Sequence, residues 1–454
     1  MSGGRAGSET QHHVGSITDA DVAALFAPFE DLAGQGVVLA VSGGSDSMGL
    51  MHLFARWRAL RAQQGRALPA PHIASIDHGL RPESAEEAAF VLAAARALGL
   101  PAHVRRWQGP KPSSGVSEAA REARYDLLAE VMEEVGARVL MTAHTADDQA
   151  ETVLMRLARG SGVDGLAGMA PVRALARPAG SWLVRPLLGL DKERISSDLV
   201  HRGIAWRSDP TNADPDYERP RLRAARSTLQ AVGLTPANLG RSAERLRRAS
   251  LALEQIAQEV MSEPGVRIDP LGLVQLELAA LRARPDEIAL RVLRLAIEIA
   301  GGSAAPVSLA SLEAVLDDLR AGRATAWTLA RAALHAQKGA LQVQREPGRS
   351  PLPRLPLRAG ANLIWDGRFD ITVEGNCSAM EVGPLGADGL AVLAAGGLAR
   401  PKVPALTLRA APAVWQGDTL IAVPLLGVPP PAAMQLVVRM RLRTPMDRRR
   451  GGTA

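Results

Sequence analysis

The chain has 454 residues, of which 47% are hydrophobic and 22% charged. This composition is typical of a soluble globular protein, and the length exceeds one ordinary hydrophobic core, so we expect two or three domains. The polar start lacks the apolar segment of a signal peptide, and no apolar run is long enough to span a membrane. We therefore expect a cytoplasmic protein with no membrane partner.

Cysteine content and charge narrow the choice of function. The only cysteine, Cys377, excludes an internal disulfide, a cysteine-based zinc site and a cysteine-ligated iron–sulfur cluster. The net charge of +6 suits an anionic partner such as RNA. Nearly all the basic residues are arginine, however, so a compositional bias of the genome explains the charge as well.

Predicted strands and helices alternate from about residue 18 to residue 210. Short apolar runs predict strands at 36–41, 72–77, 102–107, 138–142 and 182–187. Amphipathic stretches predict helices near 47–63, 83–98, 116–135 and 147–159. This alternation indicates an α/β fold with a doubly wound parallel sheet, in which ligands bind beyond the carboxyl ends of the strands.

The rest of the chain changes character twice. Residues 220–335 predict an arginine-rich α-helical region without strand alternation, with helical spacing near 236–262, 284–300 and 309–321. After a proline-rich linker at 347–356, strands are predicted at Phe369–Val373, Thr419–Val423 and Leu436–Met440. We therefore predict three domains, at 1–215, 216–345 and 346–454, the last a small α+β domain with an arginine-rich tail.

The loop Ser42-Gly43-Gly44-Ser45-Asp46-Ser47 joins the first predicted strand to its helix. Free backbone N–H groups and the positive helix end favour an anion there, and Gly43 and Gly44 allow a close backbone approach. The serines add hydroxyl donors, and Asp46 suits Mg²⁺ or a group near the phosphates. The chain has no G-x-x-x-x-G-K-[ST] pattern, so a Walker A grip is not expected. The alternative is a small-residue turn without a ligand.

Two further groups of polar residues suit a nucleotide. Asp77 and His78 follow the second predicted strand, where they would reach adenine or ribose, although an ordinary strand-ending turn explains them too. On the predicted helix 116–135, Arg121 and Arg124 share a face, which suits phosphates or RNA. A solvated face of arginines and glutamates is the alternative.

A histidine and three carboxylates follow the fourth predicted strand. Acidic residues are common in the first turn of a helix, but Asp147, Asp148 and Glu151 next to His144 exceed what capping requires. If the helix extended back to His144, then His144, Asp148 and Glu151 would share one face. Such carboxylates suit a cationic amine, a metal ion or a general base, with capping alone as the alternative.

The segments after this helix contain glycines and then arginines. Residues 160–165 match G-x-G-x-x-G, but they follow a helix, so we reject dinucleotide binding and expect a flexible loop. The later arginines suit an RNA backbone, with an exposed basic helix of no function as the alternative. These candidates are Arg219, Arg221, Arg223, Arg226, Arg241, Arg245, Arg247 and Arg248.

Taken in order, these motifs resemble the tRNA(Ile)-lysidine synthase family. They read VSGGSDS, DHGLRPES, EAAREARY, TAHTADDQAET, RGSGVDGLAGM, RPLL and WRSDPTN. The first motif alone indicates only the superfamily of N-type ATP pyrophosphatases, or PP-loop enzymes, which split ATP into AMP and pyrophosphate. The DHGLR and TAHTADDQAET motifs together are much more specific.

The resemblance implies a PP-loop catalytic domain at 1–215, followed by tRNA-binding domains, and a ligase reaction in two steps. ATP adenylates the C2 carbonyl oxygen of the wobble cytidine in a CAU-anticodon tRNA(Ile) and releases pyrophosphate. The ε-amine of free L-lysine then attacks C2 and expels AMP. Members of the family are often homodimers, and no residue pattern here marks an interface.

The resemblance also implies roles for individual residues. ATP would contact Ser42, Gly43, Gly44, Ser45, Asp46, Ser47, Asp77 and His78, with Mg²⁺ at Asp46. Asp148 and Glu151 would hold lysine and help deprotonate it, and His144 and Arg124 would position phosphate or cytidine. The tRNA would contact Arg219, Arg221, Arg223, Arg245 and Arg248.

The chain departs from the family pattern in two places. Thr145 stands where a second histidine is frequent, and residues 219–223 read R-P-R-L-R in place of R-N-x-I-R, so neither the histidine nor the asparagine contact carries over. Three other functions compete: a tRNA cytidine thiolase, a regulatory module that grips ATP, and a plain RNA-binding protein. The single cysteine argues against the thiolase, and the extra carboxylates argue against a passive ATP binder. A measured dependence on ATP would distinguish the enzyme from a plain RNA-binding protein.

Overall fold

The computed structural model describes residues 16–79, 83–109, 111–112, 115–178, 180–207, 218–302, 307–346, 348, 351–398 and 401–441. The chain divides into two compact units, Met1–Ser250 and Leu251–Ala454. The division at 250/251 coincides with neither of the domain boundaries expected at 215/216 and 345/346, and those boundaries stay predictions. None of the described helices is long and apolar enough to cross a membrane.

The first unit is built on a six-stranded sheet in the order β3-β2-β1-β4-β6-β5. Neighbouring strands are parallel except at the edge, where β5 pairs antiparallel with β6. The strands are β1 (Val37–Ala40), β2 (His72–Asp77), β3 (Ala102–Arg106), β4 (Val139–Met141), β5 (Val172–Ala174) and β6 (Trp182–Val184). The predicted doubly wound α/β fold is confirmed. Only β5 was missed, because three residues give too short an apolar pattern to recognise.

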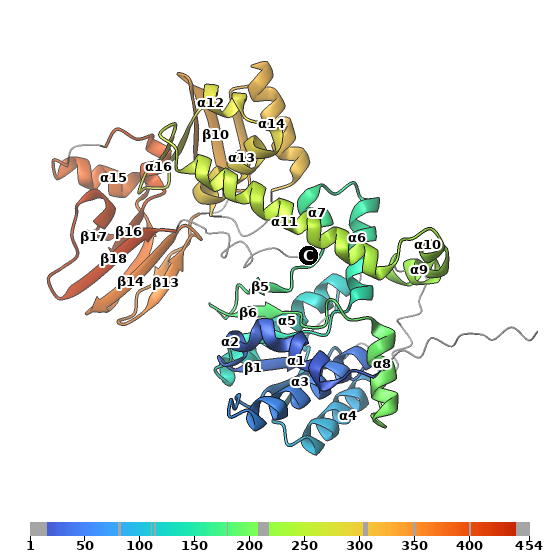
Figure 1. The fold of residues 1–454 in the computed structure, drawn as a ribbon. Coiled ribbons are helices and arrows are strands. Elements are labelled where there is room, and N and C mark those ends of the chain that lie inside the picture. Colours follow the sequence, from blue (N-terminus) through green and yellow to red (C-terminus); the bar gives the residue numbers. More distant parts are fainter. Residues whose placement is uncertain are drawn as a thin grey trace, which may run out of the picture. The chain divides into compact units, whose positions relative to one another are not determined.

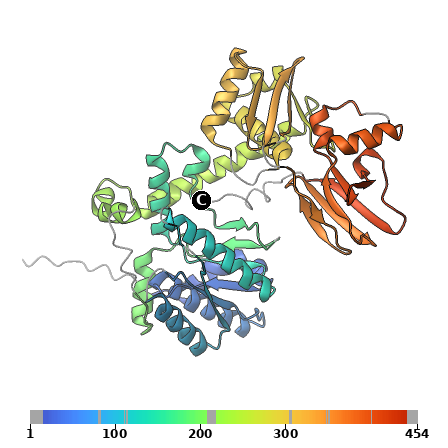
Figure 2. The same cartoon turned by 180° about the vertical axis from the view of Figure 1, so that it is seen from behind.

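Helices cover both faces of this sheet (Figures 1 and 2). Val37 and Leu39 of β1 belong to the core that also contains residues of α1, α3, α4 and α8, whereas Val38 packs with residues of α5. The helices of this part of the chain, including those that do not cover the sheet, are α1 (Asp19–Phe26), α2 (Glu30–Ala33), α3 (Ser45–Gln63), α4 (Ser84–Ala97), α5 (Val116–Glu134), α6 (Ala146–Ala158), α7 (Val163–Leu166), α8 (Lys192–His201), α9 (Glu218–Ala224), α10 (Arg226–Ala231) and α11 (Pro236–Met261), with a 3₁₀ turn at Ala27–Phe29. The last of them, α11, continues beyond Ser250, the last residue of the first unit. Successive side chains of a strand point to opposite faces of the sheet, and both sets are buried beneath helices.

Aromatic packing fixes α3, the helix that follows the glycine-rich loop. Phe26, Phe54 and Trp57 are almost fully buried, and their ring centroids lie 5.1–5.5 Å apart. Rings at this spacing contribute beyond their buried area. Because α3 begins at Ser45, this packing holds the loop in place.

The second unit begins with a sheet that the sequence did not predict. Five antiparallel strands lie in the order β7-β8-β11-β10-β9. They are β7 (Val266–Ile268), β8 (Val274–Glu277), β9 (Ala326–Leu329), β10 (Ala332–Gln337) and β11 (Ala340–Arg345), and the accompanying helices are α12 (Leu278–Ala283), α13 (Asp286–Gly301) and α14 (Leu309–Ala321). The predicted helices are present, but the expectation of no strand alternation is wrong. Three of the strands, β9, β10 and β11, begin with alanine, which favours helix over strand. The local composition therefore did not indicate strands here.

The remainder of the second unit contains two more sheets, β12-β15-β16-β17 and β13-β14-β18. The strands are β12 (Leu355–Pro356), β13 (Asn362–Trp365), β14 (Phe369–Gly375), β15 (Glu381–Pro384), β16 (Pro412–Gln416), β17 (Thr419–Ala422) and β18 (Met434–Met440), with helices α15 (Gly386–Ala395) and α16 (Ala405–Arg409) and a 3₁₀ turn at Pro424–Leu426. The three strands predicted here are confirmed. The tail arginines beyond Arg441 lie outside the described residues.

A buried ion cluster connects the parts of the second unit. The Asp366 carboxylate is 0% exposed and accepts hydrogen bonds from Nε of Arg368 at 2.7 Å and Nε of Arg345 at 2.9 Å, and it also pairs with Arg331. Burial alone would raise the pKa of Asp366, but the guanidinium groups of Arg345 and Arg368 lower it. Gly367 beside it has φ +69°, and a Cβ there would lie 2.1 Å from the Gly302 carbonyl oxygen, so only glycine fits.

Candidate active site

The glycine-rich loop closes on itself between β1 and α3. Gly43 has φ +90°, which glycine adopts without strain. The Ser47 hydroxyl donates to the Gly44 carbonyl at 3.0 Å and accepts the Ser42 N–H at 3.1 Å, and the Arg207 N–H donates to the Gly43 carbonyl at 2.9 Å. Ser47 therefore shapes the loop with its one hydroxyl proton, while Ser42 is exposed at the surface.

Asp46 at the start of α3 is paired with a lysine from a distant part of the sequence. Nζ of Lys192, the first residue of α8, lies 2.7 Å from Asp46 Oδ2. Burial raises the pKa of Asp46, and the charge of Asp148 raises it further. The hydrogen bond from Lys192 acts in the opposite direction. The loop thus holds a half-exposed ammonium group that a Walker A motif would supply from its own sequence.

The end of β2 brings Asp77 and His78 to the same edge of the sheet. Asp77 is buried and accepts hydrogen bonds from Ser84 and from the Gly79 N–H, so burial is outweighed and its pKa is lowered. Arg124 of α5 donates to His78 Nε2 at 2.9 Å through its terminal nitrogen. Asp77 therefore stabilises the turn, while His78 and Arg124 form a polar pair. The following residues of the motif, Leu80, Arg81 and Pro82, lie outside the described part.

His144 precedes α6 and is not on it. The helix begins at Ala146, with Thr145 as its N-cap, so the single face shared by His144, Asp148 and Glu151 does not form. His144 Nδ1 lies 2.9 Å from the Thr142 hydroxyl. Burial, with Arg185 nearby, lowers the pKa of His144 to about 4, so the ring is neutral at physiological pH.

The three carboxylates of α6 have three different sets of partners. Asp148 accepts the Thr145 N–H at 2.9 Å in a capping box, so capping explains this residue. Asp147 pairs with Arg226 at 2.8 Å and accepts the backbone N–H of Lys192 at 2.9 Å. Glu151 accepts two hydrogen bonds from Arg223, at 2.6 and 3.2 Å. Capping of α6 explains neither Asp147 nor Glu151.

A cavity of about 290 Å³ joins these groups within the first unit. Asp46, Lys192, Asp148 and Glu151 line one part of it. Asp147, Arg223 and Arg226 also line the cavity. Leucines of α6, α9, α10 and α11 and of the turn between the last two line another part of it: Leu154, Leu222, Leu229, Leu234 and Leu239. The cavity therefore combines a charged part with an apolar part, which is the form of a small-ligand site.

Several arginines gather around His144. Arg185 and Arg121 both lower the pKa of His144 through their charge, and Arg173 lowers that of Arg185. Burial brings the pKa of Arg185 to about 10, and its terminal nitrogen donates to the Ala170 carbonyl at 2.7 Å. These positive charges lie close together, which favours an anion beside them.

The arginines expected to bind RNA fall into two groups. Arg223 and Arg226 pair with carboxylates of α6, and Arg219 lies 3.9 Å from Glu151. The other group is exposed and has no ion-pair partner within the described part of the chain: Arg221, Arg241, Arg245 and Arg248. The structure thus brings the first group to the cavity and leaves the second available to solvent.

The glycine-containing segment 160–168 is held in place by its neighbours. Gln149 exchanges two hydrogen bonds with the Met169 backbone, at 2.7 and 3.0 Å. Arg156 donates to the carbonyls of Gly165 and Gly168, and Arg247 donates to that of Met169. Part of the expected loop is a short helix, α7 (Val163–Leu166), so the prediction of a loop is wrong there, and its flexibility stays a prediction. Arg247 is engaged here.

Comparisons with known proteins agree with this geometry. A family model described as a PP-loop domain matches residues 17–227. A tRNA(Ile)-lysidine synthase of Bradyrhizobium sp. (strain BTAi1 / ATCC BAA-1182) is 48% identical over 319 residues, 67% of this chain and 84% of the relative. The enzyme of the same name from Ruegeria pomeroyi is 37% identical over 397 residues, 86% of this chain and 88% of the relative. The chain belongs to the tRNA(Ile)-lysidine synthase family.

As a tRNA(Ile)-lysidine synthase family member, the chain is a ligase with an ATP-binding PP-loop domain. The relative in Methylobacterium nodulans is 46% identical over 326 residues, 70% of this chain and 92% of the relative. Among solved structures, the U34-tRNA thiolase NcsA of Methanococcus maripaludis aligns with 50% of this chain and 77% of its own, at 16% identity and a TM-score of 0.41.

The structure of this lysidine synthase family member adds two residues that motif reading did not assign to the site. Lys192 pairs with the PP-loop, and Arg226 pairs with Asp147, although Arg226 was expected only among RNA contacts. Lys192 is one of four lysines in a chain whose other positively charged side chains are arginine, and this rarity is the one sequence feature that sets it apart. Nothing in the local sequence indicates its partner, because 146 residues separate the two.

The described part of the chain holds no cluster of side chains that would bind Mg²⁺ by itself. Within the described residues, no group of three or more histidine, cysteine, aspartate or glutamate side chains is placed to hold a metal ion. Asp148 lies close enough to Asp46 for its charge to raise the pKa of Asp46. One or two carboxylates suit Mg²⁺ that is held mainly by substrate phosphates.

Proposed function

We propose that the protein ligates L-lysine to C2 of the wobble cytidine in a CAU-anticodon tRNA(Ile), through an adenylated cytidine. The observation that carries this proposal is that one cavity is lined both by Asp46 of the PP-loop with its partner Lys192 and by Asp148 and Glu151 of α6. An ATP site and an amine site in one cavity suit a reaction that first activates a carbonyl and then attacks it.

The PP-loop side would carry out the adenylation. The loop N–H groups and the start of α3 would receive the phosphates of ATP, and His78 with Arg124 would lie by its nucleoside or α-phosphate. Lys192 would leave Asp46 and pair with the departing pyrophosphate, whose charge it would stabilise. When bound, Mg²⁺ at Asp46 would supply further stabilisation of this charge.

The α6 side would carry out the attack by lysine. Its ε-ammonium group would pair with Glu151 and Asp148, and a carboxylate there would take the proton, because an ammonium group is no nucleophile. The leucines of the cavity suit the four methylene groups of the lysine side chain. Arg223 and Arg226, which pair with Glu151 and Asp147, would receive its α-carboxylate.

The RNA would bind through positive charge around this cavity. Neutral His144, with Arg121 and Arg185 nearby, suits the cytidine and its adjacent phosphates. The exposed Arg221, Arg241, Arg245 and Arg248 suit phosphates farther along the RNA, where they would position the substrate without reading its sequence. We also propose that the enzyme acts in the cytoplasm, where tRNA, ATP and lysine occur together; a homodimer stays a prediction.

Incubation of the protein with ATP, Mg²⁺, radiolabelled lysine and a tRNA(Ile) transcript with a CAU anticodon tests this function. A transcript with uridine at the wobble position is the control. We expect label in the cytidine transcript alone. AMP formation with a different RNA or nucleophile, and no lysine label, would contradict the lysidine assignment while retaining an ATP pyrophosphatase.

A further inference from the structure

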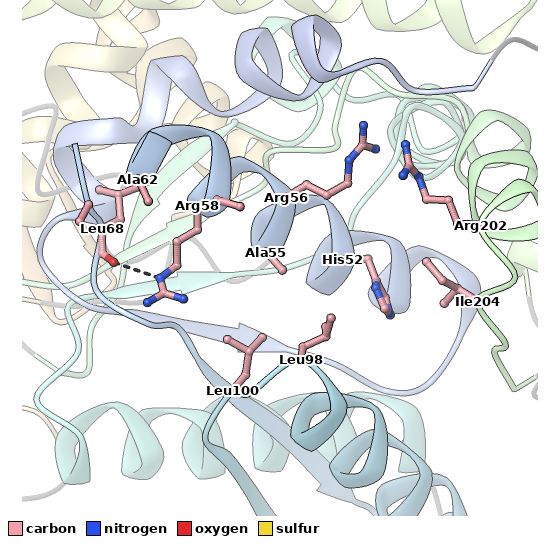
Figure 3. Close-up of a pocket in the computed structure, with 12 residues that line it drawn as sticks. His52, Ala55, Arg56, Arg58, Ala62, Leu68, Leu98, Leu100, Arg202 and Ile204 are labelled. Atoms are coloured by element: carbon pink, nitrogen blue, oxygen red, sulfur yellow. Dashed lines mark hydrogen bonds between the residues drawn. The ribbon is translucent and has the colours of Figure 1, made fainter. Parts of the chain in front are cut away.

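A second cavity, of about 620 Å³, lies along the C-terminal part of α3 (Figure 3). It is bounded by α3, the loop after it, the turn between α4 and β3, and the end of α8. It shares no lining residue with the cavity of the proposed reaction. Its volume is in the range that encloses a small-molecule ligand.

The floor of this cavity is narrow and apolar. Ala55, Ala59 and Ala62 are four and three residues apart on α3, so they form one strip of small side chains. Leu98 and Leu100 lie across from this strip (Figure 3). A strip of alanines facing two leucines suits a planar ring better than a branched or bulky group.

One end of the cavity has positive charge that no carboxylate neutralises. Nε of Arg58 donates to the Leu68 carbonyl at 3.0 Å, and within the described residues its two terminal nitrogens have no hydrogen-bond partner. No aspartate or glutamate is among the residues that line the cavity. Because a guanidinium group has two terminal nitrogens in a plane, it matches phosphate oxygens in geometry as well as in charge.

The other end is polar but already balanced in charge. Arg56 pairs with Asp19 at 2.7 Å, and Arg202 pairs with Asp198 at 3.0 Å. His52 lies at this end beside Arg202 (Figure 3), and burial together with Arg202 lowers its pKa, so the ring is neutral. A neutral imidazole both donates and accepts a hydrogen bond, which suits the edge of a heterocyclic base.

We propose that this cavity binds a nucleoside monophosphate, with its base between the alanine strip and the two leucines and its phosphate on Arg58. The edge of the base faces His52. A long acyl anion would satisfy Arg58 and the apolar floor but would leave His52 and Arg202 against hydrocarbon, so the two polar ends favour the nucleotide. This site is separate from the PP-loop.

Calorimetric titration of the full-length protein with AMP, GMP, CMP and UMP, and separately with laurate, tests the proposal. The PP-loop is first saturated with a non-hydrolysable ATP analogue, and the variants identify the cavity. Arg58→Ala removes the phosphate partner, and Ala55→Trp fills the space above the floor. Arg66→Ala is the matched control, because Arg66 is nearby and 69% exposed but does not line the cavity.

We expect at least one of the four nucleotides to bind at one additional equivalent per chain. Arg58→Ala weakens this binding about tenfold or more, since a charge-assisted hydrogen bond is lost. Ala55→Trp abolishes it and Arg66→Ala leaves it unchanged, with circular dichroism confirming that each variant is folded. Should Ala55→Trp fail to fold, Arg58→Ala decides.

Three results would overturn the proposal. These are no additional binding of any nucleotide, additional binding that Arg58→Ala does not weaken, and binding of laurate in place of nucleotides. The titration contains neither tRNA nor lysine, so its result does not depend on the proposed ligation.

Discussion

Two networks of carboxylates and cations, one in each compact unit, differ in how far water reaches them. In the second unit, Asp366 is 0% exposed, its partners Arg345 and Arg368 are 5% and 1% exposed, and its third partner Arg331 is 40% exposed. In the candidate active site, the carboxylates are 10–21% exposed and the cations Lys192, Arg223 and Arg226 are 40–48% exposed. The same kinds of side chain therefore form a closed cluster in one place and an open one in the other.

The difference in exposure decides what each network does. A buried carboxylate among buried guanidinium groups has no alternative partner, so its pairs fix the structure around it. Half-exposed cations contribute little to stability, because water competes for them, and they exchange partners when a charged ligand enters. We infer that the Asp366 network maintains the fold and that the Asp46, Asp147 and Glu151 pairs mark positions for substrate charges.

The largest expected effect is on the closed network. Asp366→Asn leaves Arg345 and Arg368 buried without a counter-charge, so the free energy of unfolding falls by about 3–5 kcal/mol. Urea unfolding followed by circular dichroism measures this loss. Asp370→Asn is the control, because that carboxylate is 54% exposed and its removal changes the free energy by less than about 1 kcal/mol. Equal midpoints for Asp366→Asn and the wild type would contradict the comparison.

The next effect is on catalysis at the open network. Asp46→Asn and Lys192→Ala each slow adenylation about a hundred- to a thousandfold. Lys192→Ala removes the positive charge that would pair with the departing pyrophosphate, and Asp46→Asn removes the carboxylate that would hold Mg²⁺ beside it. Their unfolding free energies change by less than about 1 kcal/mol, as expected for a half-exposed pair. ATP–pyrophosphate exchange with tRNA present measures the rate, and Lys338→Ala, at an exposed lysine, is the control. A fully active Lys192→Ala variant would remove this lysine from the mechanism.

A smaller effect separates two neighbouring arginines of α9. Arg223→Ala raises the KM for lysine about tenfold, because one charge-assisted contact is lost, whereas Arg221→Ala leaves this KM unchanged. Arg223 pairs with Glu151, and Arg221 is exposed. Steady-state kinetics at saturating ATP and tRNA measure both values. The same KM for the two variants would show that the position of Arg223 in the cavity is irrelevant to lysine.

The smallest effect is a pH dependence of stability. The pKa of His144 is about 4 in the folded protein and about 6.5 in an unfolded chain, so between these values the unfolded state binds more protons. The free energy of unfolding therefore falls as the pH falls through this window. His144→Gln should lose less stability than the wild type between pH 7 and about pH 5. Thermal melts at the two pH values measure this, and parallel losses would contradict a neutral, buried His144.

The sequence predicted the parts of the site that are local in the chain. The loop Ser42–Ser47, the turn at Asp77 and the acidic start of α6 each follow a strand, and parallel strands bring such segments to one edge. Contacts between distant segments could not be predicted from the sequence. The pairs of Lys192 with Asp46 and of Arg226 with Asp147 depend on how α8 and α10 return to the sheet, which no local pattern encodes.

The most direct test of the account is the capture of the adenylated RNA in a Glu151→Gln variant. ATP labelled in its α-phosphate, Mg²⁺, lysine and the CAU-anticodon transcript are incubated with the wild type, with Glu151→Gln and with Asp46→Asn. The account predicts that label accumulates on the RNA with Glu151→Gln, which lacks the carboxylate for the attack by lysine, and not with Asp46→Asn. A Glu151→Gln variant that transfers lysine like the wild type, or one that leaves the RNA unlabelled, would contradict this division of the two steps between the PP-loop and α6.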